Sequence, residues 1–220
     1  MIGTIQIAGA IDEKDALTII ESGADEIALP VGPFLKTPEL TDLKARELFL
    51  FLKGKIRTLA ITYLTDAKTI AELLQQLGIN RVQLHGSISV AETYRLKEMM
   101  PCFVMKSVAI GQFPFEKLKC TVDEFSQIVD AFIFDTFDSE DQSTGATGKT
   151  HNWSVSRDLV LFADRPVILA GGLDPNNVRH AIEFVRPQGV DAHTRLEGSD
   201  GRKDPELLGV FVKNARQAFG

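Results

Sequence analysis

One stretch of the chain indicates the fold most directly: Val167-Ile168-Leu169-Ala170-Gly171-Gly172-Leu173-Asp174-Pro175. Its four leading apolar residues predict a buried strand, and the paired glycines predict a tight turn. Asp174 and Pro175 are typical of an N-cap and a first helical position. This geometry favours phosphate binding, because glycine lets the backbone approach a ligand and free N–H groups at a helix start attract anions. A tight turn without a ligand is the alternative.

Short apolar runs alternate with longer amphipathic runs along the whole chain. Strands are predicted over residues 4–8, 26–29, 56–62, 81–84, 103–107, 131–134, 167–170 and 189–192. Helices are predicted over residues 14–22, 40–52, 67–77, 90–99, 122–128, 154–162, 176–185 and 205–218. Eight strand–helix units in 220 residues predict a single α/β domain over residues 1–220, a (β/α)₈ TIM barrel. A doubly wound sheet is the competitor, but the first strand runs into Gly9-Ala10-Ile11-Asp12, without a G-x-G-x-x-G motif.

Composition limits the classes of partner. A formal charge of −6 and the lack of a basic run argue against nucleic acid. No apolar run approaches the ~18 residues that a membrane span needs, and the first residues do not resemble a signal peptide. The two cysteines, Cys102 and Cys120, lack metal-ligand spacing, so we expect no metal site, no disulfide framework and a cytoplasmic location. The sequence leaves monomer and homodimer open.

In a (β/α)₈ barrel, functional groups collect where the strands end. Here those positions hold Gln6, Ala8, Gln83, His85, Lys106, Asp135, Gly171, Gly172, Asp191 and His193. Asp135 follows the apolar run 131–134, so its carboxyl is a candidate general acid or base; an N-cap or surface role is the alternative. His85 suits proton transfer or a ligand hydrogen bond, or is structural. An inward Lys106 is costly unless it meets an anion.

Residues 136–152 form the one long irregular stretch between predicted elements. They are rich in Ser, Thr, Gly and Asp and follow the sixth strand. Such a segment at the active end of a barrel predicts a mobile lid. His151 lies in this stretch, and the sequence assigns it no role.

Several motifs match one known family over nearly the whole chain. They include Val82-Gln83-Leu84-His85-Gly86, Asp135, Thr147-Gly148-Lys149-Thr150, the glycine stretch at 170–178 and Gly201-Arg202-Lys203-Asp204. Together they resemble the phosphoribosylanthranilate isomerase family of tryptophan biosynthesis. The resemblance implies a (β/α)₈ barrel, no cofactor, and an Amadori rearrangement of a phosphorylated sugar amine to a 1-deoxyribulose.

The resemblance also implies roles for individual residues. The family's general acid falls on Asp135. The strand-end positions and the matching motifs together predict contacts to substrate or phosphate at Gln83, His85, Lys106, Gly148, Gly171, Gly172, Asp191, Thr194 and Arg195.

Three segments depart from the family pattern. The family opens with Lys-Ile-Cys-Gly, whose cysteine is the base, whereas this chain reads Gln6-Ile7-Ala8-Gly9. A methyl group accepts no proton, so the change at Ala8 removes a contribution on the order of 10²–10⁴-fold in rate. The family's carboxylate-binding arginine is absent near Pro30-Val31-Gly32-Pro33-Phe34-Leu35-Lys36, where Lys36 is a weaker substitute. Val-Ser-Ser-Gly becomes Ala192-His193-Thr194-Arg195.

His193 is a candidate replacement for the lost base. In a closed barrel the eighth strand lies beside the first, so the end of strand 189–192 is next to Ala8. An imidazole titrates near neutral pH and is able to act with Asp135 as a base–acid pair. Alternatively, His193 and Arg195 only add positive charge near the phosphate. Two functions stay open: an Amadori-type isomerase, and an inactive barrel that binds a phosphorylated metabolite or a protein partner.

Overall fold

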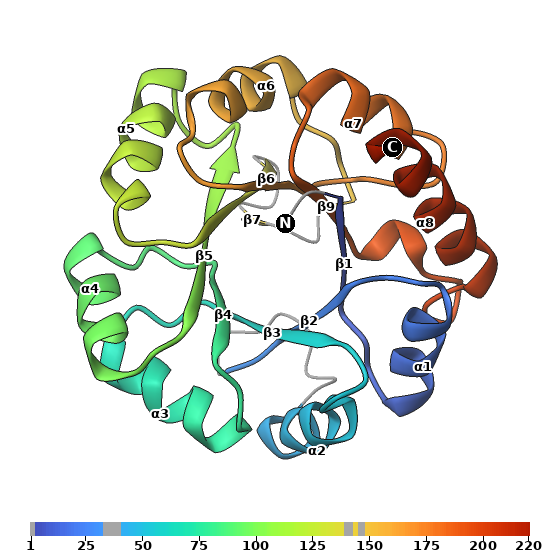
Figure 1. Cartoon of the computed structure of the whole chain (residues 1–220), viewed down its shortest axis with the longest axis horizontal. Coiled ribbons are helices and arrows are strands. Elements are labelled where there is room, and N and C mark those ends of the chain that lie inside the picture. The colour runs from blue at the N-terminus through green and yellow to red at the C-terminus, as the bar shows by residue number, and fades with distance from the viewer. Residues whose placement is uncertain (1–2, 33–40, 139–142, 145–147) are drawn as a thin grey trace.

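Eight parallel strands form one closed barrel at the centre of the molecule (Figure 1). The computed structural model describes residues 3–32, 41–138, 143–144 and 148–220. The barrel strands are β1 (Thr4–Ala8), β2 (Glu26–Pro30), β3 (Arg57–Thr62), β4 (Arg81–Leu84), β5 (Phe103–Ile110), β6 (Ala131–Asp138), β8 (Val167–Leu169) and β9 (Gly189–Ala192). They follow the order β5-β4-β3-β2-β1-β9-β8-β6, and the pairing of β5 with β6 closes the ring. The predicted (β/α)₈ fold is confirmed.

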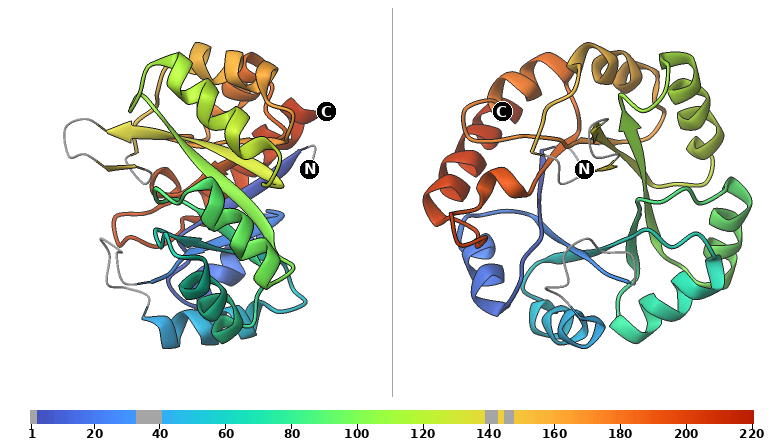
Figure 2. Two further views of the ribbon diagram at one scale, coloured as in Figure 1. Left: turned by 90° about the vertical axis from the view of Figure 1, so that its left-hand side faces the viewer. Right: turned by 180° about the vertical axis from the view of Figure 1, so that it is seen from behind.

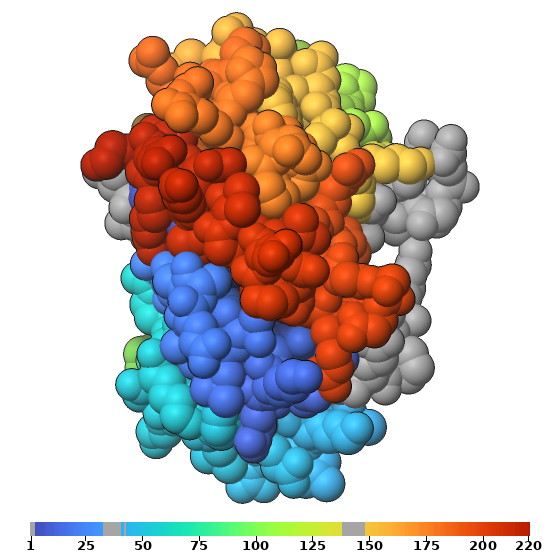
Figure 3. All heavy atoms as spheres, turned by 90° about the vertical axis from the view of Figure 1, so that its right-hand side faces the viewer, coloured from blue at the N-terminus to red at the C-terminus, as the bar shows by residue number. Residues whose placement is uncertain are grey.

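Helices surround the barrel on all sides (Figures 1 and 2). They are α1 (Glu13–Glu21), α2 (Asp42–Leu52), α3 (Ala67–Leu77), α4 (Val90–Met99), α5 (Phe115–Ser126), α6 (Trp153–Phe162), α7 (Val178–Val185) and α8 (Pro205–Phe219). The last helix packs against α1, so the first and last helices of the chain lie side by side (Figure 3). Among the described residues, no helix is long and apolar enough to cross a membrane.

Helix α3 illustrates how the sequence specifies these elements. Asp66 caps its first turn by accepting the N–H of Thr69, and Gly78 ends it in the left-handed conformation that glycine adopts most easily. Ile70, Leu74 and their helical neighbours form one buried face against the sheet. The pattern that predicted the helix is therefore the pattern that packs it.

Buried apolar side chains form two clusters, one outside the barrel strands and one inside them. The larger cluster lies between the strands and the helices. A smaller one fills the inside of the barrel and consists of Ala8, Ala28, Leu59, Ile61, Met105, Ala131, Ile133, Ile168 and Ala170. The inner cluster identifies which residues on each strand face inward, because side chains alternate between the two faces of a strand.

Some predicted boundaries are wrong. Helix α5 begins at Phe115 rather than at residue 122. Its first two turns have only two buried positions, Leu118 and Val122, so this segment shows little apolar periodicity in the sequence. The stretch 136–152 is only partly irregular: β6 runs on to Asp138 and pairs antiparallel with the short strand β7 (Ser143–Thr144). A lid role for the rest of that stretch stays a prediction.

Candidate active site

Asp135 lies on the inner face of β6, in the same alternation as Ala131 and Ile133. The side chain is buried, and its Oδ1 accepts the N–H of Thr136 at 2.7 Å. Burial raises the pKa of Asp135, and positive charge at His85, the Thr136 hydrogen bond and positive charge at His193 oppose the rise. A raised pKa keeps a carboxyl group protonated closer to neutral pH, which is the state that a general acid needs.

Asp191 lies on β9, close enough to Asp135 for the charges of the two carboxyl groups to interact. Its Oδ1 accepts the side-chain amide of Gln6 at 3.0 Å, and the strand register places Gln6 directly beside it. Burial, followed by the charge of Asp135, raises the pKa of Asp191 to about 7, although the Gln6 hydrogen bond opposes this. The structure thus brings two of the predicted site residues together as a pair of interacting carboxyl groups.

Gln83 and His85 form a second polar pair at the end of β4. The side-chain amide nitrogen of Gln83 lies 3.0 Å from Nδ1 of His85. An amide nitrogen only donates, so Nδ1 is the acceptor and the neutral ring carries its proton on Nε2. The ring of Tyr63 packs edge-on against His85, with centroids 4.8 Å apart. Both predicted residues therefore face the barrel interior in a fixed orientation.

His193 lies beside the position that the family's base would occupy. The register pairs Ile7 with Ala192, so the next residues, Ala8 and His193, are neighbours across β1 and β9. The imidazole covers Gly9 so closely that any Cβ at position 9 would overlap the ring. Its Nε2 lies 3.3 Å from Oε1 of Glu197. The structure brings His193 to the predicted place.

Lys106 does not join this group, because it alternates with the inner residues of β5 and faces the helices. Its Nζ donates to the carbonyl oxygens of Leu84, Gly86 and Ser107 at 3.3, 3.0 and 2.9 Å. The ammonium also lies 5.6 Å from the ring of Phe125. Burial lowers the pKa of Lys106 to about 8. Backbone carbonyls, rather than an anion, offset the cost of burying it.

The paired glycines after β8 are required by chain packing. Gly171 and Gly172 have φ values of +88° and +61°. A side chain at 171 would overlap the hydroxyl of Thr136, and a Cβ at 172 would lie 2.5 Å from the carbonyl carbon of Lys149. The two glycines let the segments after β6 and β8 meet. Tight packing alone explains them, so their role in phosphate binding stays a proposal.

The segment after β9 completes this cluster. A Cβ at Gly148 would lie 3.5 Å from the Thr194 hydroxyl, and Nε of Arg195 donates to the Gly148 carbonyl at 2.7 Å. A second guanidinium nitrogen lies 3.3 Å from Oδ2 of Asp174. Gly148, Thr194 and Arg195 are therefore brought to the glycine pair, and Arg195 links the two neighbouring loops.

The predicted N-cap at Asp174 is wrong. Helix α7 begins at Val178, and Asp174 instead caps the turn before it, where its Oδ1 accepts the N–H groups of Asn176 and Asn177 at 2.8 and 3.1 Å. A turn separates Asp174 from the first residue of the helix, and the Asp-Pro pair in the sequence does not distinguish such a turn from a helix start. Lys36, the substitute suggested for the carboxylate-binding arginine, lies outside the described residues.

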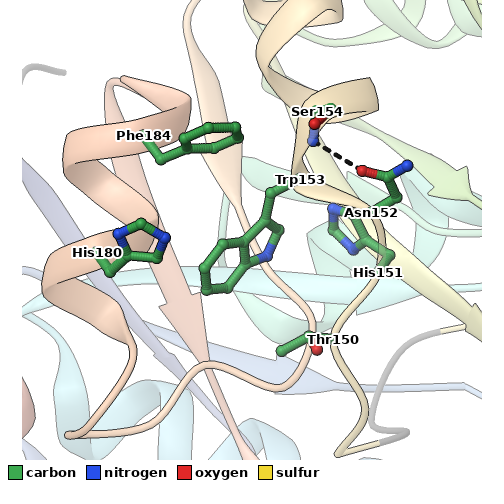
Figure 4. A pocket seen from close by; sticks show the side chains of 7 residues that line it. All are labelled: Thr150, His151, Asn152, Trp153, Ser154, His180 and Phe184. Carbon is green, nitrogen blue, oxygen red and sulfur yellow. Dashed lines mark hydrogen bonds between the residues drawn. The ribbon is translucent and has the colours of Figure 1, made fainter.

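His151 is a polar residue to which the sequence assigned no role. Its Nδ1 lies 2.9 Å from the Thr136 hydroxyl and its Nε2 lies 2.6 Å from the Ser156 hydroxyl, and burial lowers its pKa to about 4. An open surface pocket of about 340 Å³ lies next to it, between α6 and α7 (Figure 4). In that view Trp153 lies between His151 on one side and the rings of His180 and Phe184 on the other. His151 therefore ties the end of β6 to the start of α6.

Within the described part of the chain, no group of three or more His, Cys, Asp or Glu side chains is arranged to hold a metal ion. Acid–base chemistry by side chains is what the gathered residues offer.

A closed (β/α)₈ barrel with ionisable side chains at the carboxyl ends of its strands defines the class of (β/α)₈-barrel enzymes. Within that class, the chain belongs to the phosphoribosylanthranilate isomerase family: the family model described as N-(5'phosphoribosyl)anthranilate (PRA) isomerase matches residues 5–214. The chain is thus a phosphoribosylanthranilate isomerase-like protein of a family of isomerases in aromatic amino-acid biosynthesis.

Individual relatives agree with this membership. The chain is 36% identical over 218 residues to N-(5'-phosphoribosyl)anthranilate isomerase 2 of Methanosarcina mazei, covering 98% of this chain and 95% of the relative. The phosphoribosyl anthranilate isomerase structure from Thermotoga maritima has a TM-score of 0.82 and 27% identity, covering 99% and 100% of the two chains. A further structure, with a TM-score of 0.79, 26% identity and the same coverage, holds reduced 1-(o-carboxyphenylamino)-1-deoxyribulose 5-phosphate.

Proposed function

We propose that this chain catalyses the Amadori-type isomerisation of a phosphoribosyl amine, with Asp135 as the general acid and His193 as the general base. The observation that carries the proposal is the position of these two groups. Asp135 is buried on β6 with a raised pKa, and His193 lies beside Ala8 on the β1–β9 side, close enough that a proton on His193 lowers the pKa of Asp135. The site thus offers an acid, Asp135, and a base, His193, for the two proton transfers of the reaction.

The chemistry needs one acid and one base. Asp135 gives its proton to the ring oxygen of the sugar, and the bond between C1 and that oxygen breaks to form an iminium ion. His193 then removes the proton from C2, and the electron pair of that C–H bond neutralises the iminium as an enolamine. The enolamine becomes a 1-amino-1-deoxyketose when a proton moves from its oxygen to carbon. The reaction has no net oxidation and requires no cofactor.

Phosphate recognition is assigned to the cluster after β6, β8 and β9. Backbone N–H groups around Gly171 and Gly172 and the hydroxyl of Thr194 suit phosphate oxygens, because such groups point at anions without a charge of their own. Arg195 brings a guanidinium to the same cluster and links its loops. Gln83 and His85 then face the sugar, and Oε1 of Gln83 is a buried acceptor with no partner among the described residues.

The test is a turnover assay with purified protein on two substrates. Phosphoribosylanthranilate and its analogue without the carboxylate are compared, because residues 30–36 lack the family's carboxylate-binding arginine. We expect turnover of at least one substrate and complementation of a strain that lacks the isomerase. No turnover of either substrate, with inorganic phosphate still bound, would establish instead a binding barrel without activity.

A further inference from the structure

The imidazole of His193 packs directly against the backbone of Gly9. Gly9, with φ +81°, lies directly under the ring, and any Cβ there would overlap it. Gly9 therefore limits where the ring can lie. Hydrogen bonds with Glu197 and Lys203, two residues to which the sequence assigned no role, hold His193 as well.

Glu197 and Lys203 form the support behind the ring. Oε1 of Glu197 lies 3.3 Å from Nε2 of His193 and 2.5 Å from Nζ of Lys203. The Lys203 side chain is fully buried, and its Nζ also donates to the carbonyl of His193 at 3.3 Å. A backbone bridge pairs Glu197 with Lys203 across the turn between them. Side chain and backbone therefore hold the same three residues together.

The charges in this network are compensated. Burial would raise the pKa of Glu197, but the hydrogen bonds from His193 and Lys203 outweigh it and lower that pKa to about 2. Glu197 is thus an anion near neutral pH. Burial lowers the pKa of Lys203, and the contact with Glu197 opposes the fall. Lys203 also donates its backbone N–H to Asp15 at 3.2 Å, which anchors the support to α1.

We propose that Glu197, backed by Lys203, is the positioning residue that keeps the proton of neutral His193 on Nε2 and so leaves Nδ1 as the base. This inference rests on the proposed function, in which His193 removes the C2 proton. A carboxylate accepts but does not donate, so Nε2 must carry the proton that faces it. The arrangement repeats the general logic of a base oriented by a carboxylate. The segment after β9 thus supplies the oriented base that Ala8 on β1 does not.

The test is Glu197→Gln, which keeps the shape of the side chain and removes its charge. We expect kcat to fall about tenfold or more with KM within twofold, because the substitution changes the tautomer and not substrate contacts. The direct readout is the ¹⁵N spectrum of His193 in labelled protein, where the Nε2–H form is expected in the parent and a mixture of tautomers in the variant. Glu183→Gln, which breaks the exposed Arg179–Glu183 pair on α7, is the matched control and should change neither readout.

The outcomes separate the two proposals. An unchanged ¹⁵N spectrum in Glu197→Gln overturns the positioning role even if His193→Ala abolishes turnover. Conversely, full turnover in His193→Ala overturns the proposed base, whereas the spectrum still reports on Glu197 alone. If Glu197→Gln does not fold, Glu197→Asp keeps the charge beside Lys203 while shortening the reach to Nε2. We then expect a mixture of tautomers and a lower kcat in a folded protein, and a parent-like spectrum would overturn the inference.

Discussion

The two sides of the barrel mouth hold their ionisable groups in different ways. On the β6 side, Asp135 projects from the strand itself, and its pKa is raised mainly by burial. On the β1–β9 side, Ala8 stands at the position of the family's base, and the candidate base, His193, comes from the segment after β9, where Glu197 and Lys203 hold it. A side chain on a strand is held in place by the strand itself, whereas a side chain on a loop needs hydrogen bonds from neighbouring residues to hold it. We therefore expect the acid to tolerate changes around it better than the base does.

The largest expected effect comes from the acid side. In Asp135→Asn, isomerase turnover should fall on the order of 10²–10⁴-fold, because the amide has no acidic proton to give to the sugar oxygen. Ligand affinity should change little, since Asn keeps an oxygen for the N–H of Thr136. Steady-state kinetics together with inorganic phosphate binding check this. Turnover within twofold of the parent would remove Asp135 from the mechanism.

The second effect concerns stability and the carboxyl group of Asp191 on β9. The folded pKa of Asp191, about 7, lies above the unfolded value near 4, so the folded protein keeps a proton that the unfolded chain loses between those pH values. The free energy of unfolding of the parent should therefore fall as the pH rises from about 4 to 7. Asp191→Asn does not titrate and should be more stable than the parent at pH 8, on the order of 2 kcal/mol, with little difference at pH 4.

Urea unfolding of both proteins at several pH values measures this difference. Glu183→Gln again serves as a control, because its partner Arg179 is exposed and the pair contributes little to stability. Parallel curves for parent and Asp191→Asn across the whole range would show that Asp191 is ionised in the folded protein.

The smallest effect concerns the phosphate cluster. Arg195→Ala should weaken inorganic phosphate binding about tenfold, because it removes one charge-assisted donor while the backbone groups remain. Arg179→Ala, on the surface of α7, is the matched loss of an arginine and should leave binding unchanged. Calorimetric titration measures both. Tighter binding in Arg195→Ala would mean that the guanidinium, held by Gly148 and Asp174, blocks the site.

The sequence predicted the barrel and the position of Asp135 better than the contacts of the other polar residues. Periodicity predicts the barrel because each strand and helix must bury one face, and the position of Asp135 follows from the apolar run before it. The same reasoning misplaced Lys106, because the end of a strand does not reveal which face a residue occupies until the inner cluster is known. The turn capped by Asp174 was likewise mistaken for the first turn of α7.

The polar network was harder to predict for a physical reason. His193 was predicted from the closure of the barrel, but the roles of Glu197 and Lys203 depend on a turn that folds back on itself through the Glu197–Lys203 bridge. His151 is buried by contacts with Thr136 and Ser156, which belong to different elements. Such tertiary hydrogen bonds leave no periodic signal in the sequence.

The central claim is that the base of the reaction has moved from β1 to the segment after β9. It is tested most directly by measuring kcat/KM for four proteins: the parent, Ala8→Cys, His193→Ala and the double variant. We expect His193→Ala to lose about 10²-fold and the added cysteine to restore about tenfold in that variant, because it returns a base to β1, while adding little to the parent. Parent-like kcat/KM in His193→Ala would contradict the account.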